Sequence, residues 1–359
     1  METTIATLSV PPTNNNPANE SLLKTFTIKN TKGTSLLVCN YGAAVISIFV
    51  KDRAGNFSDV VLGYENPRDY LTDDYYIGTV VGRYANRIMG DNIIIDNHPY
   101  LISTRPGGYH QHGGFAGFNK KYFDATPFSE KGKTGVSLKY TSQHLEEGFP
   151  GKLELEVIYT LDEEDNWTVE YKAVSDKTTL INLTQHTYFN LSGKLSGSID
   201  DHELQITANS YLPVNKLQVP TGVLATVIDT PFDFTEFKKI DKDLFEEDEQ
   251  LKLSNGYDHS FVLETEKTGA LKPAAIVQEN TSGRKLEVFT TEPAVHLYTG
   301  NFLENIIGKN GIVYNQRSGL CLETQHFPDA PNHADFPSTV LKAGELFYSK
   351  TVFRFSVEI

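Results

Sequence analysis

The stretch KLELEVIYTLDEEDNWTVEYKAV, residues 152–174, contains two runs of alternating residues joined by an acidic turn. In the first run, Leu153, Leu155 and Val157 lie on one side of an extended chain, and Glu154 and Glu156 lie on the other. Successive side chains of a β-strand point to opposite faces of its sheet, so this spacing predicts a half-buried strand. The second run, residues 166–174, alternates in the same way and predicts another strand.

Similar runs recur along most of the chain, separated by turns rich in Gly, Pro, Asn and Asp. Examples are SLLVCNYGAAVISIFV at 35–50, NIIIDNHPYLI at 92–102, AVHLYTG at 294–300 and TVFRFSV at 351–357. No Gly/Ser linker divides the chain, and the strands lack the spacing of βαβ units. We therefore predict an all-β fold, a large antiparallel β-sandwich that forms a single domain over residues 21–359. Residues 1–20, rich in Pro, Asn, Thr and Ala, are expected to be a flexible tail.

Residues 236–253, EFKKIDKDLFEEDEQLKL, break this alternation. Phe237, Ile240 and Leu244 are spaced closer to a helical period than to a strand period. The high charge of the segment fits either a short exposed helix or an irregular loop.

The composition restricts the class of partner. The 359 residues include 46 acidic and 32 basic side chains, which give a net charge of −14. This sign argues against nucleic acid, whose phosphates require a basic surface, and against anionic membranes. The two cysteines are too few for a disulfide framework, and their surroundings do not have the spacing of a zinc site. We expect a cytoplasmic protein with a neutral partner, because we find neither a signal-peptide pattern nor an apolar run of membrane-spanning length.

The segment SGLCLETQHFPDAPNH, residues 318–333, places a carboxylate in an apolar strand. Leu320, Leu322 and Thr324 share one face, while Cys321, Glu323 and Gln325 share the other. Taken alone, the segment favours a solvated face of a half-exposed sheet. The alternative is that Glu323 belongs to a functional site.

Two histidines, His110 and His112 in GGYHQHGG, would point to one face if that segment were extended. The spacing is one that metal-binding β-barrels use, but no carboxylate follows nearby, and the glycines indicate a loop. We therefore expect no metal site and favour a polar loop histidine or a sugar contact.

Other candidate residues have ordinary structural interpretations when taken singly. His186 in NLTQHTYFNL fits a satisfied buried histidine, Asp258 in GYDH fits a turn cap, and His296 in PAVHLYTGN fits a surface position. Asn86 and Arg87 in YANRI fit a structural ion-pair site. Together, these residue types suit proton transfer on a neutral polyhydroxylated ligand. The chain contains no nucleophile elbow, P-loop or dinucleotide fingerprint.

The order of eleven motifs resembles that of the aldose 1-epimerases, from about residue 22 to the C-terminus. They include VGRYANRI, HGGFAGF, NLTQHTYFNLSG, GYDHSFVL, AVHLYTGNFL and CLETQHFPDAPNH. The resemblance implies a β-sandwich with a sugar cleft on one sheet. It also implies an isomerase that interconverts the α and β anomers of free aldoses such as galactose and glucose, without a cofactor or metal, in a protein that is often a monomer.

The same resemblance assigns roles to individual residues. The glutamate of CLETQ, Glu323, corresponds to the general base, and the histidine of NLTQHTYFNL, His186, to the general acid. The histidine of HGG, His112, is implied to lie beside the sugar ring. Asp258 is implied to bind sugar hydroxyls, as are Arg87 and its neighbour Asn86. His296 stands where the family has a substrate-contacting glutamine and is expected to bind the substrate in its place.

Some positions depart from the family pattern and bear on which sugar is preferred. Gln111, preceded by His110, replaces a leucine before HGG, and Gln185 replaces an asparagine before the acid histidine. Two further functions remain open at this stage. One is a β-sandwich that binds sugar without catalysis, and the other is an epimerase for a hexose 6-phosphate, with Arg105 as a candidate phosphate ligand.

Overall fold

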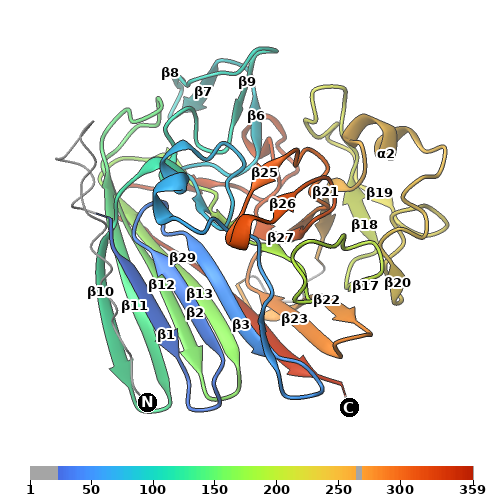
Figure 1. The fold of residues 1–359 in the computed structure, drawn as a ribbon. Coiled ribbons are helices and arrows are strands. Elements are labelled where there is room, and N and C mark those ends of the chain that lie inside the picture. The colour runs from blue at the N-terminus through green and yellow to red at the C-terminus, as the bar shows by residue number, and fades with distance from the viewer. Residues whose placement is uncertain (1–22, 264–268, 359) are drawn as a thin grey trace.

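Three antiparallel sheets form most of the protein, as the computed structural model shows for residues 23–263 and 269–358 (Figure 1). The tail expected over residues 1–20 lies outside the described residues. Both runs of the opening stretch form the predicted strands, β12 (Leu153–Asp162) and β13 (Asn166–Ser175), which pair with Val157 opposite Tyr171. The predicted all-β fold is confirmed.

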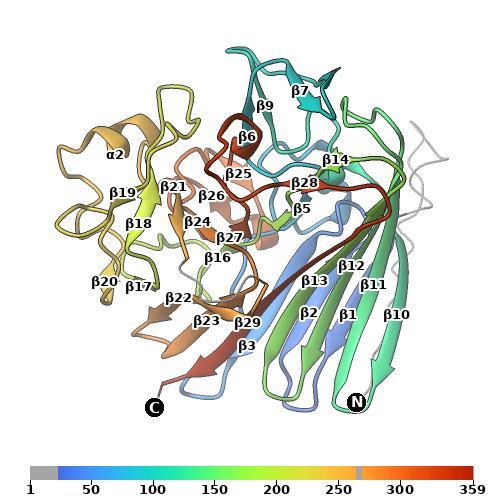
Figure 2. The ribbon, with the colours of Figure 1, turned by 180° about the vertical axis from the view of Figure 1, so that it is seen from behind.

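The largest sheet has nine strands, with β12 and β13 beside each other near one end. Its strand order is β10 (Asp124–Glu130), β11 (Lys133–Ser142), β12, β13, β29 (Leu346–Val357), β23 (Arg284–Thr290), β22 (Lys272–Glu279), β17 (Glu203–Ile206) and β20 (Lys238–Lys239). Seen from behind, β29 crosses the molecule between the β10–β13 half and the β22–β23 half (Figure 2).

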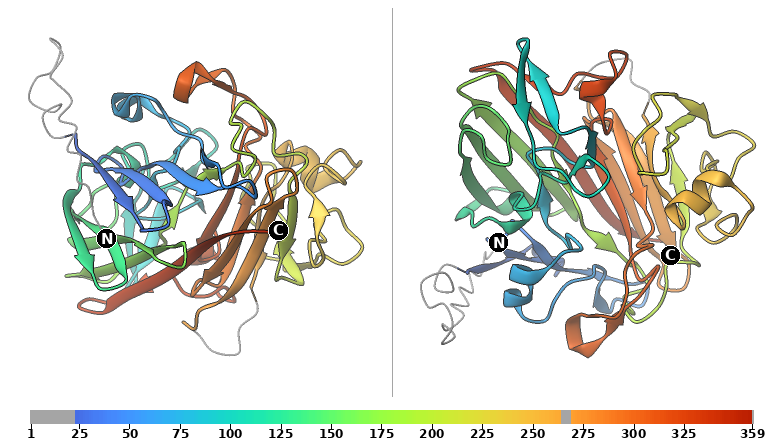
Figure 3. Two further views of the ribbon diagram at one scale, coloured as in Figure 1. Left: turned by 60° about the horizontal axis from the view of Figure 1, so that its bottom comes forward. Right: turned by 90° about the horizontal axis from the view of Figure 1, so that it is seen from above.

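Two further sheets cover the inner face of this sheet (Figure 3). The four-stranded sheet is β1 (Thr25–Lys29), β2 (Ser35–Cys39), β3 (Val45–Lys51) and β4 (Phe57–Asp59). The six-stranded sheet is β16 (Tyr188–Phe189), β27 (Leu320–Gln325), β24 (Ala294–Tyr298), β21 (Asp258–Val262), β18 (Ser210–Leu212) and β19 (Ala225–Thr226). Side chains from all three sheets enter one hydrophobic cluster, so the architecture is a sandwich.

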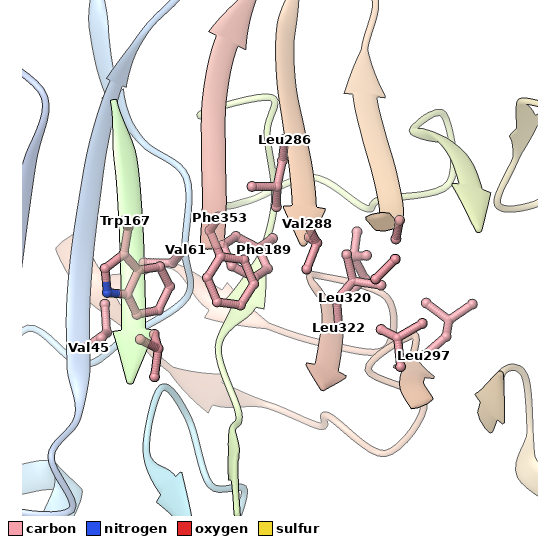
Figure 4. Packing of buried hydrophobic residues seen from close by; sticks show 14 of the residues in the cluster. Val45, Val61, Trp167, Phe189, Leu286, Val288, Leu297, Leu320, Leu322 and Phe353 are labelled. Atoms are coloured by element: carbon pink, nitrogen blue, oxygen red, sulfur yellow. The ribbon is translucent and has the colours of Figure 1, made fainter. Parts of the chain in front are cut away.

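The centre of this cluster lies where the sheets meet (Figure 4). Trp167 of β13 stacks on Phe353 of β29 with ring centroids 4.7 Å apart. Leu320 and Leu322 of β27 and Leu297 of β24 face the same core. Because β27 and β24 present alternate residues to the core, their remaining side chains must point to the opposite face of the six-stranded sheet.

Short elements surround the sheets. The two-stranded pairs are β14 (Thr179–Leu180) with β28 (Val340–Leu341), β15 (Thr184–Gln185) with β5 (Val80–Val81), β6 (Arg87–Met89) with β9 (Tyr109–Gln111), β7 (Asn92–Ile95) with β8 (His98–Leu101), and β25 (Ile306–Ile307) with β26 (Val313–Tyr314). The helical turns are η1 (Pro67–Thr72), η2 (Phe118–Lys120), η3 (Lys309–Gly311), η4 (Ala330–Asn332) and the α-helix α2 (Glu249–Ser254). None of the helices in the described parts of the chain is long and apolar enough to cross a bilayer.

Residues 236–253 combine both predicted alternatives. Only the last part is helical, beginning after the N-cap Asp248, whose carboxylate accepts hydrogen bonds from the backbone of Gln250 and Leu251. The residues before it have a helical spacing but form no helix. Lys238 belongs to β20, which pairs with β17, and its ammonium group contacts Asp243 at 2.7 Å. This ion pair closes an irregular loop in place of an earlier helical turn.

Candidate active site

Strand β27 carries the candidate base into the protein interior. Leu322 belongs to the core, and the Thr324 hydroxyl contacts the Thr351 hydroxyl on β29 at 2.6 Å, so these residues face the large sheet. Glu323 points to the other face, as its position in the alternation predicts, but only 2% of it is exposed. The reading of this face as solvated is therefore wrong. Residues from other segments of the chain cover this face and form a cavity with Glu323.

His186 lies beside Glu323 because the chain segment that precedes β16 is fixed at both sides. The His186 backbone donates to Thr79 and accepts from Gly78, each at 2.9 Å. The His186 Nε2 atom lies 3.6 Å from Glu323 Oε1, and its Nδ1 atom lies 3.5 Å from the Cys321 sulfur. The second carboxylate oxygen of Glu323 has no hydrogen-bond partner among the described residues.

Asp258 and His296 come from the next two strands, β21 and β24. His296 pairs with Glu323 on one side and with Ser260 on the other, so the three strands bring these side chains to one face. The Nε2 atom of His296 lies 2.6 Å from Asp258 Oδ1. Asp258 is therefore close to the general base candidate but is paired with a different residue.

Asn86, Arg87 and His112 lie at one end of the paired strands β6 and β9, where Asn86 precedes β6, Arg87 begins it and His112 follows β9. The backbone N–H of Asn86 donates to His112 Nδ1 at 3.3 Å, which leaves the hydrogen of a neutral His112 ring on Nε2. The Asn86 side-chain oxygen accepts from the Arg87 backbone at 2.9 Å. The Arg87 guanidinium contacts the Gln218 carbonyl at 3.2 Å and lies over the Tyr109 ring.

A cavity of about 230 Å³ opens in this region, and all seven residues predicted for the site line it. They are Asn86, Arg87, His112, His186, Asp258, His296 and Glu323. These residues are spread over more than 230 positions in the sequence, and the fold brings them to one cavity.

The two carboxyl groups of the cavity have opposite electrostatic environments. Burial raises the pKa of Glu323 well above its ordinary value, and the negative charge of Asp258 raises it further. Burial also raises the pKa of Asp258, but the hydrogen bond and charge of His296 outweigh this effect and lower it to about 2. Carboxyl pairs whose pKa values are separated in this way divide their roles. Asp258 stays ionised at neutral pH, while the raised pKa of Glu323 makes its carboxyl group the better proton acceptor.

Both histidines near the base favour their neutral forms. Burial lowers the pKa of His186 to about 4. Burial and the neighbouring His186 lower the pKa of His112 well below its ordinary value. Because burial disfavours charge on both His186 and Glu323, a proton shared by the pair is favoured on the carboxyl group over the imidazole. A carboxylate facing an imidazolium contains the same number of protons.

The sequence interpretation missed Tyr76, which also lines the cavity. Its ring centroid lies 4.7 Å from that of His112 and 5.9 Å from that of His186. Tyr76 has a φ of 57°, an uncommon conformation for a bulky residue. The buried Asp73 carboxylate holds this turn by accepting hydrogen bonds from the backbone of Tyr75 at 3.1 Å and Ile77 at 2.9 Å. The sequence signal was an aspartate before a pair of tyrosines.

Two other candidates point away from the cavity. His110 is fully buried, and its Nδ1 atom contacts the Ser103 carbonyl at 2.8 Å, so it does not face the same space as His112. Within residues 23–263 and 269–358, no cluster of three or more His, Cys, Asp or Glu side chains has the arrangement of a metal site. The Gln185 amide contacts Tyr159 and Gly78, at 2.8 and 2.7 Å, and therefore serves packing.

A second hollow, of about 370 Å³, lies beside Glu292 and His326. Glu292 Oε2 and His326 Nδ1 are 2.6 Å apart. The Glu292 carboxylate is therefore held by a histidine at 2.6 Å, whereas Glu323 has an oxygen without a hydrogen-bond partner among the described residues. We therefore place the chemistry in the smaller cavity.

Comparison with known proteins identifies relatives over nearly the whole chain. A family model described as Aldose 1-epimerase matches residues 24–354. The chain is 42% identical to a galactose mutarotase of Rattus norvegicus, over 89% of this chain and 90% of that protein. It is 33% identical to an aldose 1-epimerase of Escherichia coli, over 93% of this chain and 95% of that protein.

Solved structures agree with these relatives. A galactose 1-epimerase from Lactobacillus acidophilus superimposes with a TM-score of 0.84 at 31% identity, covering 97% of each chain. A GalM/aldose epimerase homologue from C. elegans gives a TM-score of 0.85 at 28% identity, covering 94% of this chain and all of that chain. The predicted fold and the resemblance are both confirmed, and the chain belongs to the aldose 1-epimerase family.

Proposed function

We propose that this protein interconverts the α and β anomers of a free aldose such as galactose or glucose, with Glu323 as general base and His186 as general acid. The observation that supports these roles is the pairing of the two side chains at 3.6 Å in a cavity, with one carboxylate oxygen unpartnered among the described residues. Isomerase activity agrees with the family to which the chain belongs.

Ring opening requires two proton transfers. Glu323 in its carboxylate form takes the proton from the anomeric hydroxyl, and His186 in its imidazolium form gives a proton to the ring oxygen. The carbon–oxygen bond of the ring breaks, and the anomeric carbon becomes an aldehyde. Rotation about the neighbouring carbon–carbon bond then presents the other face of the aldehyde. Reclosure by the reverse transfers yields the other anomer.

The electrostatics of the pair suit this cycle. Opening converts carboxylate and imidazolium into carboxylic acid and imidazole, the form that burial favours. Both forms contain one proton, so the cycle requires no proton from solvent. Substrate hydroxyls that solvate the charged form bring the two forms closer in energy. Each positioned proton-transfer group contributes roughly 10²- to 10⁴-fold in rate.

The remaining residues complement a sugar hydroxyl, which both donates and accepts hydrogen bonds. Asp258 supplies a permanent acceptor because its carboxyl group is ionised at neutral pH. Arg87, Asn86 and His112, which also line the cavity, supply donors. Tyr188 and Tyr298, which also line the cavity, offer apolar ring surface to the carbon-bound hydrogens of the sugar.

This proposal needs no cofactor and no metal, because neither proton transfer changes an oxidation state. The partner is a free monosaccharide, and the protein acts in the cytoplasm as a monomer. The net charge of −14 supports a neutral partner over nucleic acid or an anionic membrane. Sedimentation analysis at micromolar concentration tests the monomeric state.

Polarimetry tests the activity. Freshly dissolved α-D-galactose and α-D-glucose should approach their equilibrium rotation faster with the wild-type protein, and Glu323→Gln should lose this acceleration. Glu287→Gln, on the outer face of β23, is the matched control and should keep full activity. Sugar binding by wild type without any acceleration would instead indicate a non-catalytic sugar-binding protein. Acceleration with glucose 6-phosphate alone would move the substrate class to phosphorylated hexoses.

A further inference from the structure

Both ring nitrogens of His296 are engaged by protein atoms. Nε2 lies 2.6 Å from the Asp258 carboxylate, and Nδ1 lies 2.9 Å from the Ser260 hydroxyl. Asp258 and Ser260 are two positions apart on β21, so they project from the same face of that strand. The register of β21 and β24 places Ser260 directly opposite His296. The three side chains therefore form a chain of hydrogen bonds across two strands.

The residue types are those of a serine hydrolase triad, but the geometry does not suit a nucleophile. Among the described residues, the lining of the cavity includes Asp258 and His296 but not Ser260. Only 2% of Ser260 is exposed. A nucleophile must reach the substrate, whereas here the carboxylate lies at the cavity and the hydroxyl lies behind the imidazole. The hydrogen bonds run from the buried Ser260 through His296 to Asp258 at the cavity. This order favours a role in holding the Asp258 carboxylate in place.

We propose that Ser260 is a positioning residue that fixes His296, and that His296 in turn holds the Asp258 carboxylate toward the sugar. The Nε2 atom of His296 carries the hydrogen that it donates to Asp258, and Nδ1 shares the second hydrogen bond with the Ser260 hydroxyl. His296 then has no ring nitrogen left for a sugar hydroxyl. It acts on the substrate through Asp258, and the sequence-based expectation of a direct sugar contact is replaced by an indirect role.

This arrangement has a physical reason. A buried carboxylate that is free to rotate loses conformational entropy when a ligand fixes it. Asp258 is buried, and its bond to an imidazole that is itself held by Ser260 removes this freedom before the sugar arrives. The inference rests on the proposed sugar site, because it assigns Asp258 to hydroxyl binding.

Binding and turnover of D-galactose measure the role of Ser260. Ser260→Ala should raise both the dissociation constant, measured by calorimetry, and KM by about 2- to 10-fold, the value of one hydrogen bond, while kcat changes by less than about twofold. Ser260→Thr keeps the hydroxyl and should restore tighter binding. Ser137→Ala is the matched control, because it removes a 2.7 Å serine hydrogen bond to Glu156 outside the cleft. Equal affinity in wild type and Ser260→Ala would overturn the proposal.

A double-mutant cycle with His296→Leu tests whether Ser260 acts through His296. In that background, Ser260→Ala should weaken galactose binding no further. An equal loss in both backgrounds would show that Ser260 acts independently, which contradicts the proposal.

Long-range proton–nitrogen NMR of the sugar-free wild type tests the same inference without substrate. We expect Nε2 of His296 to carry a hydrogen, and we expect the Nδ1 resonance to move in Ser260→Ala. A neutral ring with its hydrogen on Nδ1 would overturn the proposal, because Nε2 could not then donate to Asp258. A wild type that neither binds nor converts any aldose would refute the proposed function, and the NMR result would still decide the positioning role.

Discussion

His186 Nε2 lies 3.6 Å from Glu323 Oε1, and both side chains are almost fully buried. The two residues are 137 positions apart in the sequence; His186 immediately precedes β16, which pairs with β27, the strand of Glu323. Burial disfavours the carboxylate and the imidazolium alike, so a proton shared by the pair is favoured on the carboxyl group. The charged form required for ring opening is therefore generated against a desolvation cost, which the hydroxyls of the sugar reduce.

Glu323→Gln is expected to raise the thermal stability of the protein at neutral and alkaline pH. The pKa of Glu323 is raised in the folded state, mainly by burial, so the folded protein binds more protons than the unfolded chain above the ordinary carboxyl pKa. Stability therefore falls as the pH rises through this window. The neutral amide of the variant removes this loss. Calorimetry at pH 5 and pH 8 should show a larger gain in Tm at pH 8.

The control for this comparison is Glu287→Gln, which should shift Tm equally at both pH values. A Glu323→Gln protein that is less stable than wild type at pH 8 would contradict the raised pKa of Glu323.

His186→Gln should lower kcat for galactose by about 10²- to 10⁴-fold, because it removes one of the two proton-transfer groups. KM should change much less, since the hydroxyl-binding residues Asp258, Arg87 and Asn86 remain. Initial rates from polarimetry over a range of galactose concentrations separate the two parameters. His98→Gln, on the exposed strand β8, serves as the control. A variant that loses affinity but keeps kcat would indicate a binding role for His186.

Activity should be unchanged in EDTA. The spacing of His110 and His112 suggested a metal site only if both side chains faced the same space, but His110 packs against Phe149 with ring centroids 5.1 Å apart. A mutarotation assay after dialysis against EDTA, with and without added Zn²⁺, measures this directly. Loss of activity that zinc restores would show that the cavity binds a metal.

Alternation of apolar and polar residues was enough to predict the sheets, because each strand buries one face. It predicted which side of β27 carries Glu323, and it placed Leu322 in the core. It could not predict that Glu323 is buried, because the cover over that face comes from distant loops such as the one that carries Tyr76. Tyr76 has a positive φ in a turn where the backbone of Tyr75 and Ile77 donates hydrogen bonds to Asp73. The periodicity of the sequence does not predict these hydrogen bonds.

The roles of the site residues came from the order of motifs and not from single residues. Taken alone, His186 fitted a buried structural histidine and Asp258 a turn cap, and only tertiary structure brings them into one cavity. The network of His296 was likewise invisible in the sequence. Its partners Asp258 and Ser260 lie 38 and 36 positions away, and strand register decides the contact.

The ion pair of Glu292 and His326 should make stability depend on pH outside the active site. Their side chains are 2.6 Å apart. Burial lowers the pKa of His326, but the charge and hydrogen bond of Glu292 outweigh it and raise the pKa above the ordinary value. The His326 contribution to stability is therefore fully present below an ordinary histidine pKa of about 6.5. It is lost as the pH rises through the raised value.

His326→Gln measures this contribution, because glutamine cannot carry the charge that Glu292 faces. Removing His326 leaves the buried Glu292 carboxylate without its cationic partner, so urea denaturation at pH 6 should show a clear loss of stability. The difference from wild type should shrink at pH 9 relative to pH 6, because the charge of His326 is lost as the pH rises through its raised pKa. The exposed His98→Gln variant should match wild type at both pH values. A difference that stays constant from pH 6 to pH 9 would show that the two residues interact through an uncharged hydrogen bond alone.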